Sequence, residues 1–264
     1  MTRKLWLSIA MLAVGAGLMV AASFAGAASG SSPKSSSVGA KTGGTLQIEM
    51  DSDLDFADPQ LDYLSTGWQL QYATQVKLFN FPDKNGPAGA QLVPEGAAGQ
   101  PLVSKDGKTY TIRIKPGFTF SDGKPVTAAN YAYAINRSLN PKMNAPGASF
   151  LTDIIAGGQA VVDGKAPTAS GVIAKGNTLT IKLIKPAPDL IARLSMAFFS
   201  ATPLNLPIDP NGVDVYASAG PYYIASRTPN RQIVLKRNRT TRATARTTST
   251  RSSSTSVTRS PRSD

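Results

Sequence analysis

The sequence predicts a mixed α/β or α+β fold in an exported protein, and three observations carry this prediction. In some segments apolar residues alternate with polar ones, as in half-buried strands, and in others they recur every three or four residues, as on one face of a helix. Asp-Gly pairs at residues 106–107 and 122–123 mark tight turns. Neither long heptads nor an internal repeat occurs, so we expect both kinds of element to be mixed in one body.

The first elements expected along the chain are a strand, an acidic loop and a helix. Leu46, Ile48 and Met50 alternate with polar residues and predict a strand with one buried face. Residues 51–62 are rich in Asp and are typical of a loop. The helix is predicted from apolar residues at spacings of three and four, which are Trp68, Tyr72, Val76 and Phe79.

The middle of the chain predicts a hairpin and a second helix. A strand follows the first Asp-Gly turn, and its alternation continues to the second turn through Tyr110, Ile112, Ile114, Phe118 and Phe120. Thr127 is a candidate N-cap for the helix. The apolar stripe of that helix is Ala128, Tyr131, Ile135 and Leu139.

The last part of the body repeats this order. A hairpin is expected around residues 175–177, and one face of its returning strand carries Leu179, Ile181 and Leu183. Pro186 and Pro188 precede a third helix, whose apolar face is Leu190, Ile191, Leu194 and Phe198. Residues 220–224 and 233–235 predict the last two strands.

The composition removes most catalytic chemistries. The chain has neither cysteine nor histidine, so a Cys-His or Ser-His-Asp arrangement, a disulfide framework and the usual zinc sites are excluded. Asp53 and Asp55 could in principle serve acid–base catalysis, but they lie in the acidic loop without a partner motif. We therefore expect a protein that is not an enzyme and that holds no cofactor and no metal.

The two ends of the chain differ from its body. Residues 1–27 have a basic start, an apolar run and Ala-Gly-Ala at 25–27, the layout of a cleaved secretory signal peptide; an uncleaved membrane anchor is the alternative. Residues 28–42 predict a flexible Ser/Gly-rich tether, and no cysteine is present for a lipoprotein anchor. Residues 239–264, rich in Arg, Ser and Thr, are expected to be disordered. The predicted signal peptide implies an extracytoplasmic protein, located in the periplasm or the cell-wall space.

The net charge of +12 is concentrated at the ends. The tail holds six Arg and one Asp and so contributes +5, and Arg3, Lys4, Lys34 and Lys41 contribute +4. Only +3 remains for residues 42–238. Nucleic-acid binding would therefore rest on the tail alone, and we expect no nucleic-acid partner.

A more specific signal lies in residues 104–128, which read SKDGKTYTIRIKPG and then FTFSDGKPVTA. This stretch resembles the signature of bacterial extracellular solute-binding family 5, the oligopeptide- and dipeptide-binding components of ABC importers. Further motifs fall in the family's order; they are Gly43-Gly44-Thr45-Leu46, Asp58-Pro59-Gln60, Leu92-Val93-Pro94-Glu95, Gly220-Pro221-Tyr222 and Leu235-Lys236-Arg237-Asn238. The resemblance covers residues 43–238. It implies a periplasmic-binding-protein-like fold of type II, with the first lobe and a small subdomain present and the second lobe missing.

The resemblance also implies a ligand and partners. Family members hold an extended peptide between two lobes, largely through main-chain hydrogen bonds, and close on it about a hinge. We therefore expect an oligopeptide or a similar small solute as ligand, an ABC permease complex in the membrane as partner, and a monomer. The ligand contacts are expected in the acidic loop and at the start of the first helix, at Asp58, Tyr63, Thr66 and Trp68. Trp68 fits a core position of its helix equally well.

The resemblance ends at Asn238. Family members continue with a Pro- and Tyr-containing pattern, whereas Arg239 begins a sequence that does not fit it. If one base was lost just after the Asn238 codon, codons can be chosen so that residues 239–254 read as family-like sequence in the shifted frame. Our hypothesis is therefore that residues 239–264 are a frameshift product, with an evolved basic tail as the alternative. Without a second lobe, the chain is expected to bind peptide weakly or not at all. The competing function is a secreted interaction module whose basic tail binds anionic polymers or surfaces.

Overall fold

A computed structural model describes residues 44–50, 52–241 and 254–259. The strands are β1 (Thr45–Met50), β2 (Phe79–Asn80), β3 (Val93–Pro94), β4 (Leu102–Val103), β5 (Thr109–Arg113), β6 (Val172–Lys175), β7 (Thr178–Lys182), β8 (Tyr222–Thr228), β9 (Gln232–Arg237) and β10 (Ser254–Arg259). The α-helices are α1 (Ser65–Thr74), α2 (Ala128–Leu139), α3 (Gly158–Val162) and α4 (Leu190–Arg193). Short 3-10 helices are η1 (Gly86–Ala88), η2 (Pro141–Met143), η3 (Pro146–Phe150) and η4 (Ala197–Phe199).

The predicted signal peptide (residues 1–27) and tether (28–42) lie outside the described residues, as do residues 242–253 and 260–264 of the tail. Within the part that the structure describes, no helix is long and apolar enough to cross a membrane.

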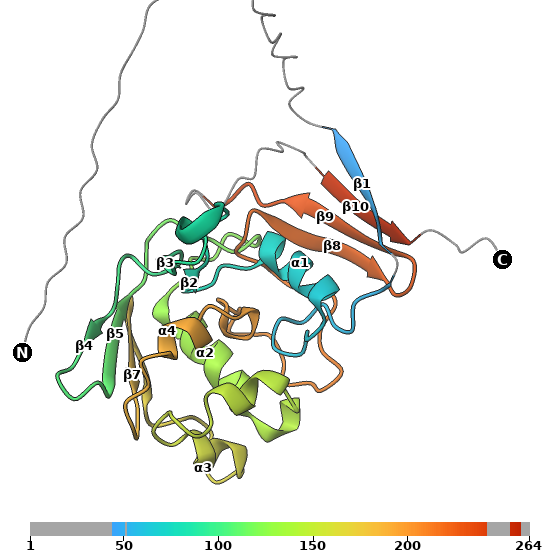
Figure 1. Cartoon of the computed structure of the whole chain (residues 1–264). Helices are drawn as coiled ribbons and strands as arrows, with labels where there is room; N and C mark the ends of the chain where they lie inside the picture. Colours follow the sequence, from blue (N-terminus) through green and yellow to red (C-terminus); the bar gives the residue numbers. More distant parts are fainter. Residues whose placement is uncertain (1–43, 51, 242–253, 260–264) are drawn as a thin grey trace, which may run out of the picture. The chain divides into compact units, whose positions relative to one another are not determined.

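One of the two larger sheets has the strand order β1-β10-β9-β8, and β8 and β9 form an antiparallel hairpin (Figure 1). Asn230 takes the left-handed conformation at the hairpin turn, with φ of 58°. Helix α1 packs on this hairpin together with part of the acidic loop. The apolar cluster between them consists of Leu54, Ala57, Leu70, Ile224, Ile233 and Leu235.

The other larger sheet, β4-β5-β7-β6, is antiparallel and packs one face against α2. Thr127 caps the helix as predicted, because its backbone N–H donates to Oδ1 of Asn130 at 2.9 Å in a capping box. The predicted stripe of α2 is buried against the sheet. The facing residues are Tyr110, Ile112, Leu179 and Ile181 from the strands and Ala128, Tyr131, Ile135 and Leu139 from the helix. Both predicted hairpins and this helix are thus confirmed.

Two predicted helices are shorter than their apolar patterns. Helix α1 ends at Thr74, and Val76 and Phe79 lie in an extended buried segment instead. The backbone of that segment is paired on several sides, since Gly220 donates to the carbonyl of Thr74 at 2.8 Å and Ala201 to that of Val76 at 2.9 Å. Helix α4 likewise stops at Arg193, and Phe198 belongs to η4.

One expectation at the start of the body is wrong. In β1, Leu46 and Ile48 are 44% and 42% exposed rather than half-buried, because residues 45–49 are exposed on both faces of the strand. Residues 254–259 of the tail form β10, parallel to β1 and antiparallel to β9, and the expected disorder of the tail as a whole stays a prediction. Their Ser, Thr and Val residues include β-branched types that suit a strand, and the backbone edges of β1 and β9 are open to pairing.

The packing of β5 on α2 predicts a large difference between its two faces. Ile112 is fully buried, so Ile112→Ala should lower the free energy of unfolding by about 2–5 kcal/mol through a cavity in the core. Thr111 lies on the outward face, and Thr111→Ala should cost less than about 1 kcal/mol. Urea unfolding followed by circular dichroism measures both, and equal losses would contradict the burial pattern.

Candidate functional site

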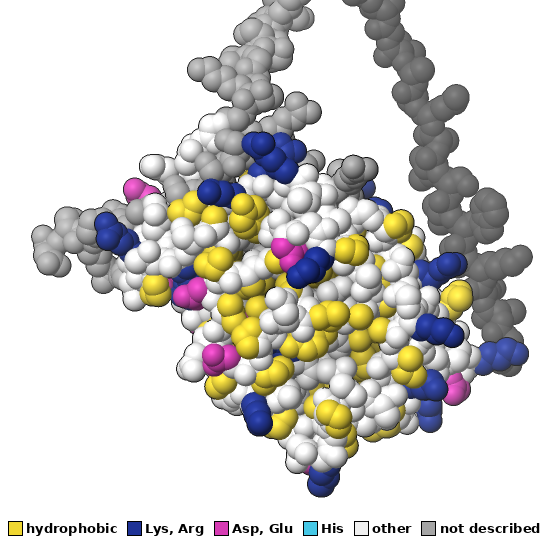
Figure 2. All heavy atoms as spheres, turned by 180° about the vertical axis from the view of Figure 1, so that it is seen from behind, with side chains coloured by type: hydrophobic (Ala, Val, Ile, Leu, Met, Phe, Trp, Pro, Cys, Tyr) yellow, Lys and Arg dark blue, Asp and Glu magenta, His cyan; other side chains and the backbone are white. Residues whose placement is uncertain are grey.

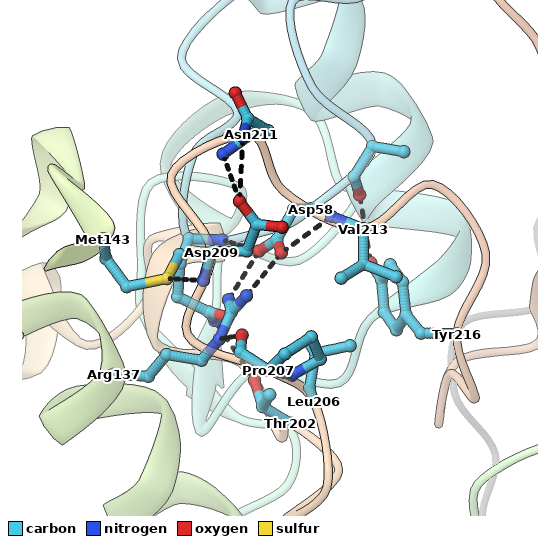
Figure 3. A network of polar contacts seen from close by, with 12 residues as sticks. Asp58, Arg137, Met143, Thr202, Leu206, Pro207, Asp209, Asn211, Val213 and Tyr216 are labelled. Atoms are coloured by element: carbon cyan, nitrogen blue, oxygen red, sulfur yellow. Dashed lines mark hydrogen bonds and ion pairs between the residues drawn. The ribbon is translucent and has the colours of Figure 1, made fainter.

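A fully buried ion pair joins α2 to the acidic loop (Figure 3). The guanidinium of Arg137 donates to both carboxylate oxygens of Asp58, from Nη1 at 2.7 Å and from Nη2 at 2.6 Å. Two parallel bonds of this kind fix the planes of both groups. Both side chains have no exposed surface, so the pair acts as a structural junction.

The segment from Thr202 to Tyr216 wraps around this junction (Figure 3). Nε of Arg137 donates to the carbonyl of Pro207 at 2.9 Å, and the backbone N–H of Val213 donates to Oδ2 of Asp58 at 3.3 Å. The hydroxyl of Tyr216 donates to the carbonyl of Ala57 at 3.1 Å. An otherwise irregular segment is therefore held on charged and polar groups of the core.

Gln60 connects the junction to an aromatic residue. Its Oε1 accepts a hydrogen bond from Arg137, and its Nε2 donates to the carbonyl of Phe198 at 2.9 Å and to the hydroxyl of Thr202 at 3.1 Å. All of the polar groups of this amide are thus engaged, and the side chain has a single favourable orientation. The side chain of Gln60 thus links Phe198 to the Arg137–Asp58 pair and fixes the position of its backbone.

Phe198 is the centre of an aromatic cluster that reaches the surface. Its ring stacks against Tyr63 and against Phe150, each with 6.1 Å between ring centroids, and meets Trp68 edge-on at 5.6 Å. Phe198 is buried and Trp68 and Phe150 are half-buried, whereas Tyr63 is 59% exposed and the neighbouring Leu64 is also exposed. A rigid aromatic surface of this kind can contact a flexible ligand with little loss of side-chain entropy.

A buried carboxyl group supports the cluster from below. Asp62 has no exposed surface, and burial raises its pKa to about 8, with a smaller contribution from the nearby Asp55 carboxylate. Its Oδ2 accepts a hydrogen bond from Nε2 of Gln71 at 2.8 Å, and its carbonyl accepts one from the indole N–H of Trp68 at 3.0 Å. A Cβ at Gly67 would overlap the carboxyl group, so α1 needs glycine there. Gly67 leaves room for the buried carboxyl of Asp62, and the carbonyl of the same residue holds the indole of Trp68 in place.

The four predicted ligand contacts are placed differently from one another. Tyr63 and Trp68 come together on Phe198, and Tyr63 is available to solvent. Thr66 is half-buried, and its buried hydroxyl oxygen has no hydrogen-bond partner among the residues that the structure describes. Asp58 must be removed from the set of candidate ligand contacts, because its carboxylate is fully buried and engaged by Arg137. Two further acids of the loop accept hydrogen bonds from backbone groups: Asp53 accepts from the N–H of Asn230 at 2.7 Å and Asp55 from that of Tyr63 at 2.8 Å.

Sequence reasoning missed Arg137, Gln60 and the central role of Phe198. A signal for Arg137 was present, since it lies three residues from Ala134 and seven from Asn130, on a second buried stripe of α2. A lone Arg on such a stripe requires a buried acid. No group of three or more potential metal-ligating carboxylates occurs in the described ranges of the chain.

The sequence of the chain matches the model of one protein family. The model of the bacterial extracellular solute-binding proteins, family 5 (middle region), matches residues 91–240. The oligopeptide-binding protein OppA of Bacillus subtilis is 33% identical over 153 residues, which are 54% of this chain and 28% of that protein. The dipeptide-binding protein DppE of the same organism is 28% identical over 213 residues, 76% of this chain and 37% of that protein.

Solved structures show the same fold. The clavulanic acid biosynthesis oligopeptide binding protein 2 superposes with a TM-score of 0.73 at 24% identity, covering 84% of this chain and 41% of that one. The unliganded open form of the periplasmic murein tripeptide binding protein MppA gives a TM-score of 0.69 at 24% identity, with coverages of 83% and 42%. The predicted mixed α/β fold is confirmed, and the chain spans less than half the length of each of these relatives.

Breaking the buried ion pair should be costly. Arg137→Met leaves the Asp58 carboxylate buried without its partner and should lower the free energy of unfolding by about 3–5 kcal/mol. Lys185→Met removes an exposed ion pair with Asp153 and should change it by less than about 1 kcal/mol. Chemical denaturation measures both, and a loss below about 1 kcal/mol for Arg137→Met would contradict the role of the junction.

Asp62 should make stability depend on pH in a definite direction. Between pH 4 and pH 8 the folded protein keeps a proton that the unfolded chain releases, since the pKa of this carboxyl is raised from 3.8 to about 8. Its contribution to stability is therefore full below pH 4 and is lost as pH rises toward 8. The neutral Asp62→Asn should gain stability over the wild type with rising pH, by an amount on the order of 1–3 kcal/mol at pH 8.

The exposed Asp83→Asn is the matched control, and its stability relative to the wild type should be flat over the same pH range. Thermal or urea unfolding at several pH values gives the comparison. Parallel pH profiles for Asp62→Asn and the wild type would show that this carboxyl is ionised in the folded protein.

Proposed function

The chain belongs to the bacterial extracellular solute-binding proteins of family 5, and from this premise we propose that it binds peptides or similar small solutes outside the cytoplasm. Two relatives carry an oligopeptide- or dipeptide-binding function in their names, OppA and DppE of Bacillus subtilis. One observation supports placing the peptide contacts at particular residues. The ring of Tyr63 is exposed and stacks on the buried ring of Phe198.

The aromatic cluster fits one wall of a peptide site. Tyr63 and Leu64 expose apolar area beside a phenolic hydroxyl, so side chains of a peptide can pack there while polar groups remain hydrated. The fixed orientation of Phe198, through Gln60, keeps this wall in place before a ligand arrives. A wall that buries one side of an extended peptide supplies only part of the contacts that a closed cleft would give, so we infer low affinity for this chain alone.

The partner in this proposal is an ABC permease complex in the membrane. We propose that the chain, as part of a solute-binding component, serves delivery of the bound solute to such a complex. The absence of cysteine and histidine is in keeping with a binding role rather than a catalytic one, and so is the use of the loop carboxylates as acceptors for backbone N–H groups. The family itself is one of solute-binding proteins.

The proposed wall can be tested by nuclear magnetic resonance. Titration of the labelled chain with a mixture of short peptides at millimolar concentration should shift the amide signals of Tyr63 and Leu64 and the indole N–H signal of Trp68. Tyr63→Ala should abolish most of these shifts, since it removes the exposed ring. Phe81→Ala removes an exposed ring outside the cluster and should leave them unchanged.

Two results would contradict the proposal. One is peptide-induced shifts that persist in Tyr63→Ala and are lost in Phe81→Ala. The other is the absence of shifts near Tyr63 at any peptide concentration up to the solubility limit.

A further inference from the structure

The outward face of the sheet β4-β5-β7-β6 carries a pattern of side chains that peptide binding does not use. Successive residues of a strand point to opposite faces, so the neighbours of the buried Ile112 and Ile181 point away from α2. Pairing between β5, β7 and β6 places these outward residues side by side. We call this set the basic sheet face, and it consists of Thr109, Thr111, Arg113, Lys175, Thr178, Thr180 and Lys182.

The cations of the basic sheet face have no acidic counterpart on it. Strands β4 to β7 contain no Asp or Glu, and Arg113, Lys175 and Lys182 are exposed. In the described residues none of the three forms an ion pair. Other lysines of the chain do pair with carboxylates, as Lys165 does with Asp163. Figure 2 shows Lys and Arg side chains gathered along the edge of the molecule where this sheet lies.

The single acid in the connecting β4–β5 turn does not neutralise this face. The carboxylate of Asp106 accepts hydrogen bonds from the hydroxyl of Ser104 and from the backbone N–H of Lys108 at 3.1 Å. These bonds close the turn on itself, and they lower the pKa of Asp106. The carboxylate stays ionised, but Lys105 and Lys108 lie in the same turn, so the turn adds no net negative charge to the neighbouring strands.

The cations stand at two ends of the face with hydroxyl groups between them. Thr178 lies next to both Arg113 and Lys175 across the ladder, and Lys182 is four residues further along β7, roughly 13 Å away. Thr111 and Thr180 form the row between, and their hydroxyls make no hydrogen bond within the part of the chain that the structure describes. Leu102 and Ile173 lie at the two edges of that row.

We propose that the basic sheet face binds a flexible, phosphate-bearing polymer, in addition to the proposed peptide binding. A linear polyanion reaches the cations at both ends of the face and places phosphate oxygens on the threonine hydroxyls between them. A single small anion reaches one end only. The face carries no aromatic side chain, so it lacks the stacking contacts that single-stranded nucleic acid uses.

This location differs from the one expected from the sequence, where polyanion binding rested on the Arg-rich tail. The body carries a small net charge, but three of its cations lie on one sheet face with no acid on the same strands. An anionic polymer responds to that local concentration rather than to the net charge of the body.

Long-chain inorganic polyphosphate is the probe that tests the proposal. In the full chain, the face variant Arg113→Gln/Lys175→Gln/Lys182→Gln should weaken polyphosphate binding at least about tenfold at low salt. It should also make the slope of log affinity against log salt shallower by about two, because up to three phosphate contacts are lost. The matched variant Lys84→Gln/Lys142→Gln/Arg231→Gln removes the same charge from exposed positions elsewhere and should weaken binding less than about threefold.

A second variant separates geometry from charge. Thr111→Val/Thr180→Val keeps all three cations and should weaken binding several-fold without changing the salt slope, because hydroxyl donors are lost and no ionic contact is. Thermal unfolding confirms that each variant is folded before binding is compared.

Three results would overturn the proposal. The first is an equal loss of polyphosphate binding in the face variant and the matched variant, which would assign binding to net charge or to the tail. The second is a face variant that binds polyphosphate as the wild type does. The third is a face variant that loses binding to vesicles of anionic lipid or to single-stranded DNA while it keeps polyphosphate binding.

Discussion

The bidentate contact between Arg137 and Asp58 is the constraint on which the surrounding structure depends. It brings together three stretches of chain that are far apart in sequence: the acidic loop, α2, and the irregular segment that holds Pro207 and Val213. Taking two charges out of water costs several kcal/mol per ion, and close geometry with further hydrogen bonds is needed to offset that cost. The carbonyl of Pro207, the amide of Gln60 and the N–H of Val213 supply those bonds. The pair therefore contributes more to the uniqueness of this arrangement than to net stability.

Neutral side chains connect the Arg137–Asp58 pair to the surface and hold the surface residues in place. Gln60 links Arg137 to the carbonyl of Phe198, and the ring of Phe198 then supports Tyr63, Trp68 and Phe150. On the other side, Asp62 holds Trp68 through its carbonyl while its own carboxyl stays protonated. An ionised Asp62 would be buried without a cation, so the protonated carboxyl has the lower free energy there. The exposed ring of Tyr63 is thus the end of a rigid chain of contacts that begins in the core.

Local patterns predicted the local structure well and the contacts between distant segments poorly. The period-two pattern of Tyr110 and Ile112 and the period-3.6 stripe of α2 were sufficient, because one face of each element is buried against the other. The pattern failed at Val76 and Phe79, where tertiary hydrogen bonds to the backbone favour an extended segment over a longer helix. Asp58 looked like a ligand contact because its partner, Arg137, lies 79 residues away. Tyr63 was predicted correctly as an exposed aromatic, but the ring beneath it, Phe198, could be identified only from the fold.

The lack of acids on the outward face of β5, β7 and β6 has no explanation in stability. Arg113 and Lys175 flank Thr178 on two neighbouring strands, so their Cα atoms are roughly 10 Å apart. Two like charges at that distance in water repel by only about 0.4 kcal/mol before screening, and salt at physiological strength removes most of that. An acid at Thr178 would gain a few tenths of a kcal/mol with each cation, which is equally small. Folding is therefore nearly indifferent to the charges on this face, and a pattern that folding does not determine is free to be set by what the face binds.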